Sequence, residues 1–289
     1  MVSGSPYADD YDHDSGRLAF PSVTRLVYRL FKSNFSAFVH TLEMCPNIQI
    51  LDLRGHTAMD AEAASHDYGR LAELAVHVTH IHIHAVNNMY RTIVALYTPQ
   101  RRSFIVELPL GQSPEGTLCS IFSDLRQGVR LSITCSLRYE TMHLSYWDID
   151  GTDSQGMHRG LFRCRGDTVQ TLWNHLPQIS LSEITIDAAL LGGVLGTHLV
   201  LPVVHELTIS ITDIDSFAFP ETGTPRFPEL RLLRLAVAKS LSMLFISASS
   251  LASFIFDLRI DGGVLAKLVL ENVTMEGGIA EVAAVVHEH

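Results

Sequence analysis

The sequence has few of the features that mark secreted, membrane or metal-knuckle proteins. Its four cysteines, Cys45, Cys119, Cys135 and Cys164, form no C-x-x-C pair, so neither a zinc knuckle nor a disulfide scaffold is predicted. Apolar stretches such as Ala188–Leu195 are much shorter than the roughly 20 residues of a transmembrane helix. The first residues have neither the basic segment nor the apolar segment of a signal peptide. We therefore expect an intracellular protein, cytoplasmic or nuclear, without a membrane anchor.

Basic charge is also scarce. The chain has 31 acidic and 21 basic residues, which gives a net charge of −10. An acidic chain gains no electrostatic energy from phosphate backbones or anionic lipids, so neither nucleic acid nor membrane is an expected partner. Apolar residues make up 47% of the chain, which is enough to bury a core. Residues 1–19 differ, because they are polar and acidic, and we expect a disordered lead-in there.

One short pattern of apolar residues recurs along the chain. It begins with a proline and places apolar residues two, five and seven positions later. Four full copies occur, at Pro21–Tyr28, Pro46–Leu53, Pro202–Ile209 and Pro228–Leu235. In a weaker copy that begins at Pro99, an arginine takes the first apolar position. Copies without the proline are Val78–Ile83, Leu181–Ile186, Leu251–Phe256 and Leu265–Leu270.

This spacing is L-x-x-L-x-L, the strand signature of a leucine-rich repeat. Its last two apolar residues lie two positions apart, so they point to the same face of a strand. The lead residues Leu26 and Leu51 are 25 positions apart, and Leu207 and Leu233 are 26 apart. Both values fall in the range of about 20–29 residues for such repeats. We therefore expect an α/β fold, a leucine-rich-repeat solenoid over residues 20–275, with a curved parallel sheet and helices on its convex side.

The segments between the expected strands favour helices, because their apolar residues recur at helical spacing. The candidate helices are Ser33–Met44, Ala61–Val76, Val86–Tyr97 and Thr168–Leu176.

The middle of the chain departs from the repeat. Two strand candidates near residues 131–133 and 142–144 lie only 11 positions apart, which favours a hairpin or an inserted arm. The glycine-rich residues that follow predict an inserted loop at about 145–167. Residues 276–289 are expected to form a C-terminal tail.

The segments FPSVTRLVY, CPNIQILDLRG, LPVVHELTI and FPELRLLRLAV resemble the leucine-rich-repeat region of F-box-type proteins, especially the divergent sets of basidiomycete fungi. The resemblance implies a recognition module that selects substrates for a ubiquitin ligase. Family members usually carry an N-terminal F-box, which docks on a cullin-complex adaptor. The first 20 residues here contain no LP-x-E-(I/L)-L opening of an F-box, so adaptor binding is not predicted.

The function predicted from these observations is non-catalytic binding of another protein on the concave face of the sheet. The outward residues of the strands have mixed charge, which suits a protein partner. The expected binding residues are Arg29, Asp52, Arg54, His80, His82, His84, Glu107, Glu183, Asp187, Glu206 and Arg234.

Three histidines, His80, His82 and His84, alternate along one expected strand. Imidazole is a common metal ligand. However, successive same-face residues of a strand stand roughly 7 Å apart, too far for three of them to share one ion easily. No acidic ligand is evident beside them in the sequence. We therefore expect solvent-facing histidines and neither a metal nor another cofactor.

The segment Asp148-Ile-Asp150-Gly-Thr152 resembles the D-x-D-G-T motif of haloacid-dehalogenase-type phosphotransferases. The resemblance implies that the first aspartate is a nucleophile and the second an acid or base. No lysine lies between Ile149 and Ala238 to steady a phosphate. We expect both aspartates on an exposed loop and no phosphatase activity. A phosphotransferase remains the alternative function, and a truncated structural fragment without an independent role is another.

Overall fold

The computed structural model describes residues 19–31, 34–55, 67–84, 89–109, 120–139, 144–175, 179–191, 200–215, 217–220, 226–239 and 241–288. The expected lead-in therefore lies almost entirely outside the described residues. Contacts within the chain define two units. Unit 1 comprises residues 1–112 and 157–162, and unit 2 comprises residues 113–156 and 163–289. The chain is mixed α/β, and most of its paired strands are parallel.

Unit 1 alternates strands and helices. Its strands pair in the order β1-β2-β3-β4-β7, and every pair is parallel. The elements are β1 (Arg25–Leu30), α1 (Phe35–Met44), β2 (Ile50–Gly55), α2 (Tyr68–Leu74), η2 (Ala75–His77), β3 (His80–His84), α3 (Tyr90–Leu96), β4 (Ser103–Glu107) and β7 (His158–Cys164). Three of the four expected helices are thus present here, each inside its predicted range.

Unit 2 begins with an antiparallel pair and continues with parallel strands, in the order β6-β5-β8-β9-β10-β12-β14. Strands β11 and β13 form a separate parallel pair. The elements are η3 (Ser120–Asp124), β5 (Val129–Tyr139), β6 (Leu144–Thr152), α5 (Gly166–His175), β8 (Leu181–Asp187), η6 (Ala188–Leu190), β9 (Glu206–Ile211), β10 (Leu232–Val237), β11 (Leu244–Ser247), α6 (Ala248–Asp257), β12 (Leu265–Glu271), β13 (Val273–Glu276), α7 (Ile279–Ala283) and β14 (Val286–Glu288).

The lead residues of the repeated pattern form the core of each unit. In unit 1, Leu26, Leu51, Ile81 and Phe104 face one another in register across four strands. In unit 2, the same position is held in register by Leu131, Ile184, Leu207, Leu233 and Leu268. All nine side chains are buried. The prediction that the leads lie buried on neighbouring parallel strands is therefore confirmed within each unit.

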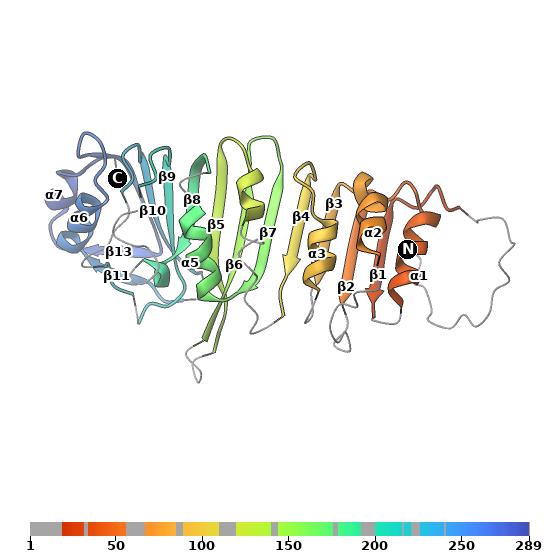
Figure 1. Cartoon of the computed structure of the whole chain (residues 1–289). Helices are drawn as coiled ribbons and strands as arrows, with labels where there is room; N and C mark the ends of the chain where they lie inside the picture. The colour runs from red at the N-terminus through yellow and green to blue at the C-terminus, as the bar shows by residue number, and fades with distance from the viewer. Residues whose placement is uncertain are drawn as a thin grey trace, which may run out of the picture. The chain divides into compact units, whose positions relative to one another are not determined.

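The helices of unit 1 cover the same face of the strands as the lead residues. The ring of Phe38 in α1 lies 4.9 Å from that of Tyr28 in β1, and Tyr97, directly after α3, lies 5.2 Å from Phe104 in β4. Figure 1 shows α1, α2 and α3 on one side of these strands. The alternate side chains of the strands consequently point away from the helices.

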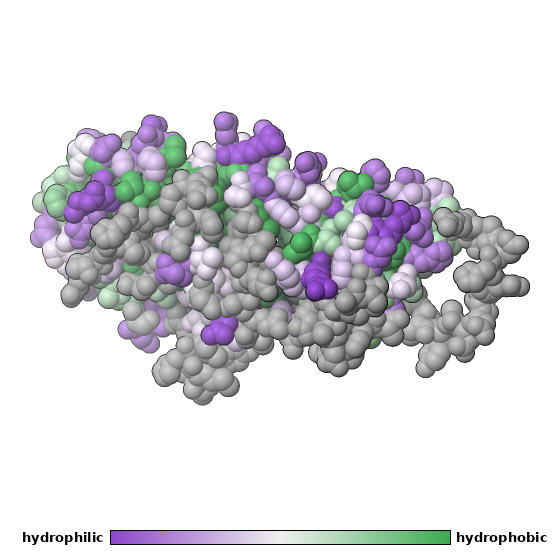
Figure 2. Space-filling model, in the orientation of Figure 1, coloured by the Kyte–Doolittle hydropathy of each residue, from purple (hydrophilic) through white to green (hydrophobic). Residues whose placement is uncertain are grey.

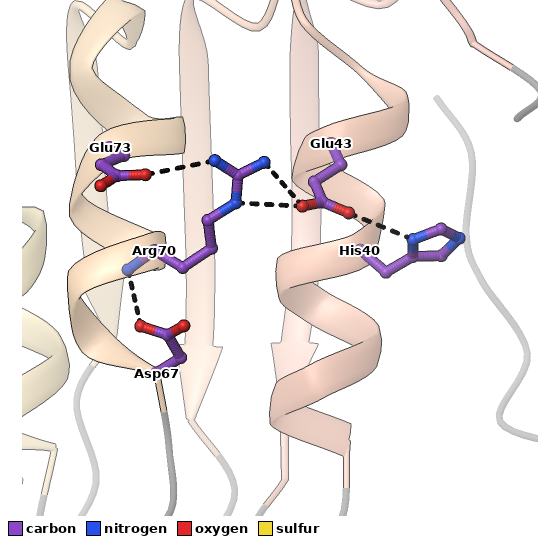
Figure 3. A network of polar contacts seen from close by, with 5 residues as sticks. All are labelled: His40, Glu43, Asp67, Arg70 and Glu73. Carbon is purple, nitrogen blue, oxygen red and sulfur yellow. Dashed lines mark hydrogen bonds and ion pairs between the residues drawn. The ribbon is translucent and has the colours of Figure 1, made fainter.

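A polar network joins α1 to α2 on the helix side (Figure 3). Arg70 donates to Glu43 at 2.8 and 3.0 Å and to Glu73 at 3.2 Å, and its backbone N–H donates to Asp67 at 2.8 Å. His40 adds a longer contact of 3.5 Å to Glu43. Figure 2 shows hydrophilic residues gathered over this part of the molecule. Exposed ion pairs of this kind contribute little to stability.

Two arginines replace apolar core residues in unit 1. Arg159 of β7 pairs with Phe104 at the lead position and is fully buried. Its guanidinium donates to the carbonyls of Pro99, Arg101 and His158 at 2.8–2.9 Å.

Arg101 takes the apolar position before β4, where the sequence pattern is weakest. It donates to the carbonyls of Leu96, Ala75 and Val78. Burial, together with the charge of Arg159, lowers the pKa of Arg101 to about 10. Both charges are thus held by backbone carbonyls.

Three expectations about the second half of the chain are wrong. The loop at 145–167 is instead β6 and β7, whose buried residues include Trp147, Ile149 and Leu161. The expected hairpin is present as antiparallel β5 and β6, but its second strand lies later than expected, because residues 131–133 pair with residues 149–151. Gly151 and Gly160 stand inside strands, and Gly151 has a packing reason, since a Cβ would lie 2.8 Å from Leu125.

The expected strand Leu251–Phe256 belongs to helix α6, because Leu251, Phe254 and Ile255 are buried at helical spacing. The expected C-terminal tail contains α7 and β14, and both Val282 and Val286 are buried. None of the helices in the part of the chain that the structure describes has the length and apolar character needed to cross a bilayer.

We predict that Leu207→Ala lowers the free energy of unfolding by about 2–5 kcal/mol, because it removes buried methyl groups and leaves a cavity. Val203→Ala is the control, since Val203 precedes the same strand and is 42% exposed. It should change stability by less than about 0.5 kcal/mol. Urea unfolding followed by circular dichroism measures both, and equal effects would contradict the core position of Leu207.

Candidate functional site

In the part of unit 1 that the structure describes, the strands present a second face opposite the helices. Its side chains form three rows across β1, β2, β3 and β4. The first row comprises Arg25, Ile50, His80 and Ser103, the second Val27, Asp52, His82 and Ile105, and the third Arg29, Arg54, His84 and Glu107. We call these twelve residues the open strand face.

A cluster of ionisable groups occupies the centre of the open strand face. It contains Asp52, Arg54, His82, His84 and Glu107, which we call the histidine–carboxylate cluster. His84 is its middle residue, because its Nδ1 hydrogen-bonds the Glu107 carboxylate and its Nε2 lies 3.6 Å from an Asp52 oxygen. Arg54 donates to both oxygens of Asp52, at 3.4 and 3.1 Å. The imidazoles of His82 and His84 lie side by side, with ring centroids 4.1 Å apart.

The environment of His82 disfavours its charged form. Burial is the largest cause that lowers the pKa of His82, and the charges of His84 and Arg54 act in the same direction. The carboxylates of Asp52 and Glu107 oppose the shift without cancelling it. His82 is therefore a neutral imidazole with an available nitrogen lone pair at neutral pH.

The expectation that no acidic group lies beside the histidines is wrong. Asp52 comes from β2 and Glu107 from β4, which are the two strands that flank β3. The repeat itself could have predicted that these groups lie together. Arg54, His84 and Glu107 each stand three residues after a lead residue, and in-register leads place such residues in one row.

The other predicted binding residues of unit 1 lie at the edges of the cluster. Arg29 is exposed and lies in register with Arg54, so two cations stand side by side. His80 lies at the start of β3, one row away, where its Nδ1 is 2.9 Å from the hydroxyl of Thr79.

The predicted binding residues of unit 2 do not form a comparable cluster. Glu183 and Glu206 lie in register on β8 and β9, as two like charges. Arg234 of β10 forms an ion pair with Glu271 of β12.

Asp187 is not an exposed binding residue, as we had expected, because only 1% of it is accessible. Its carboxylate accepts from the Ala189 N–H at 2.9 Å and from the Thr212 hydroxyl at 2.7 Å. It caps the short helix η6 and is therefore structural.

The aspartates of the phosphotransferase-like motif lie within β6 and not on a loop, which corrects the expectation. Asp148 and Asp150 pair with Thr134 and Ser132 of β5. Asp148 accepts a hydrogen bond of 2.9 Å from the backbone N–H of Arg163. The motif thus has a structural explanation in strand pairing and in the close packing at its glycine.

Comparison with known proteins finds no matching family model, no similar curated protein and no similar solved structure.

We predict that Asp187→Ala lowers the free energy of unfolding by about 1–3 kcal/mol, because the donors of Ala189 and Thr212 lose their acceptor. The matched control is Glu206→Ala, an exposed acidic residue of the neighbouring strand. That change should alter stability by no more than about 0.5 kcal/mol. Denaturant unfolding of the two variants measures both changes. An Asp187→Ala protein as stable as the parent would contradict the structural role of Asp187, which would then again be a candidate binding residue.

Proposed function

We propose that the chain is a leucine-rich-repeat solenoid that recognises another protein on its open strand face and catalyses no reaction. The observation that carries the proposal is the in-register repeat of unit 1. Each lead residue points to the helix-covered core, so each strand adds three side chains to the open strand face on the other side.

The chemistry of the open strand face suits a protein partner. Its β1 and β2 end carries the exposed cations Arg25, Arg29 and Arg54, whereas Glu107 lies on β4. Ile50 adds an apolar contact point that is 39% exposed. Charges of both signs beside exposed apolar groups favour a folded or extended polypeptide over a nucleic acid.

Substrate recognition within an F-box-type ubiquitin ligase is the specific role that we propose for this face. Its support is the resemblance of the repeated segments, together with an arrangement of strands that leaves one face open. The phosphotransferase alternative gains no support from the position of Asp148 and Asp150 inside a paired strand.

Site-specific photo-crosslinking in the native cell tests the proposed face. A photoreactive amino acid is placed at Ile50, on the open strand face, or at Val94, on helix α3. These two positions are a matched pair, because both are aliphatic and their exposures are 39% and 45%. We predict that Ile50 yields a discrete crosslinked species and that Val94 yields none.

Charge reversal provides the second arm of the same experiment. Arg29→Glu combined with Arg54→Glu should abolish the crosslinked species, because acidic groups of the partner would then face like charges. The control Arg91→Glu, on α3, should retain it. Crosslinking from Val94 alone, or from neither position, would overturn the proposal.

A further inference from the structure

Three donor groups of the histidine–carboxylate cluster converge on the open strand face. One ligand atom each from His82, His84 and Glu107 lies within 4.8 Å of the other two. All three residues are partly buried and partly accessible, so an ion can reach them from solvent. The donors stand on paired strands, which fix their backbones more firmly than loops would.

The residues around the three donors match what an occupied metal site needs. Metal-bound histidines usually give their second ring nitrogen to a carboxylate or a carbonyl. When His84 Nδ1 binds an ion, its remaining proton resides on Nε2, which lies 3.6 Å from Asp52. Asp52 is itself held by Arg54. The structure thus already contains an outer carboxylate and a cation that orients it.

The contacts already present among the donors favour ligation as well. The imidazoles of His82 and His84 lie side by side, with ring centroids 4.1 Å apart. The hydrogen bond between His84 and Glu107 brings a nitrogen and an oxygen donor together before any ion binds. An ion that bridged the two groups would replace this hydrogen bond.

We propose that His82, His84 and Glu107 form a binding site for one divalent transition-metal ion, of which Zn²⁺ is the best match. Two imidazoles and one carboxylate are a known zinc ligand set, whereas Mg²⁺ and Ca²⁺ prefer oxygen ligands alone. Three protein ligands leave a coordination position for water or for a side chain of a bound protein. The site does not depend on the proposed recognition function.

Metal titration of the purified full-length chain tests the site directly. The chain is stripped with a chelator, dialysed and titrated with ZnCl₂ in a calorimeter, and with CoCl₂ in a spectrophotometer. We expect one Zn²⁺ per chain and a visible Co²⁺ spectrum without a sulfur-to-metal charge-transfer band, since all donors are nitrogen or oxygen. A sulfur band would assign the ion to cysteine and overturn the proposal.

Variants on three neighbouring strands separate this site from the other histidines of the chain, which has 15 histidines in all. His82→Ala, His84→Ala and Glu107→Gln should each raise the Zn²⁺ dissociation constant at least about tenfold, and Asp52→Asn by about 10–100-fold. His80→Ala is the matched control, because His80 lies on the same strand outside the trio. It should bind as the parent does. Circular dichroism confirms that each variant is folded.

Absence of Zn²⁺ binding by the parent, or equal affinity in the His80→Ala and His84→Ala proteins, would contradict the site. Either result would leave the crosslinking test of the open strand face intact, so the two proposals fail separately.

Discussion

In-register packing of the lead residues is the constraint on which the other features of this chain depend. Side chains of a strand alternate between its two faces, so burying Leu51 against the helices turns Asp52 and Arg54 to the opposite face, where Asp52 is itself buried and Arg54 is exposed. The same constraint in β3 sends His82 and His84 to the face that Asp52 occupies. A slip of one residue in any strand would exchange its two faces, and the apolar core prevents that slip.

The two buried arginines show that the strand register is kept even where a charged side chain takes the place of an apolar core residue. Arg159 occupies a lead position, yet β7 keeps its register with β4. The guanidinium groups of Arg159 and Arg101 remain buried because carbonyls at the strand entrances accept their hydrogen bonds. These hydrogen bonds to backbone carbonyls offset part of the cost of burying the two charges.

The sequence predicted the parts of the fold that depend on local periodicity. Leu26, Leu51 and Leu207 were identifiable as buried leads from spacing alone, and α1 and α3 from helical periodicity. Strand β6 was missed because Gly151 resembles a loop residue, although it is needed for close packing against Leu125.

The sequence predicted seven of the twelve residues of the open strand face, but it did not predict that five of them form a cluster. Its groups lie far apart in sequence and meet only through strand pairing, although counting three residues from each lead would have aligned His84 with Glu107. The burial of Asp187 could not be predicted in this way, because it depends on a short helix and on Thr212.

Thiol labelling at two adjacent positions of β2 tests the assignment of the two faces most directly. Ile50→Cys and Leu51→Cys are each treated with a thiol reagent under native conditions, and the modified peptides are quantified by mass spectrometry. Ile50 is 39% exposed and Leu51 is fully buried. We predict rapid labelling of the Ile50→Cys protein and protection of the Leu51→Cys protein until denaturant is added. Equal labelling of the folded proteins, or the reverse order, would contradict the register and the open strand face with it.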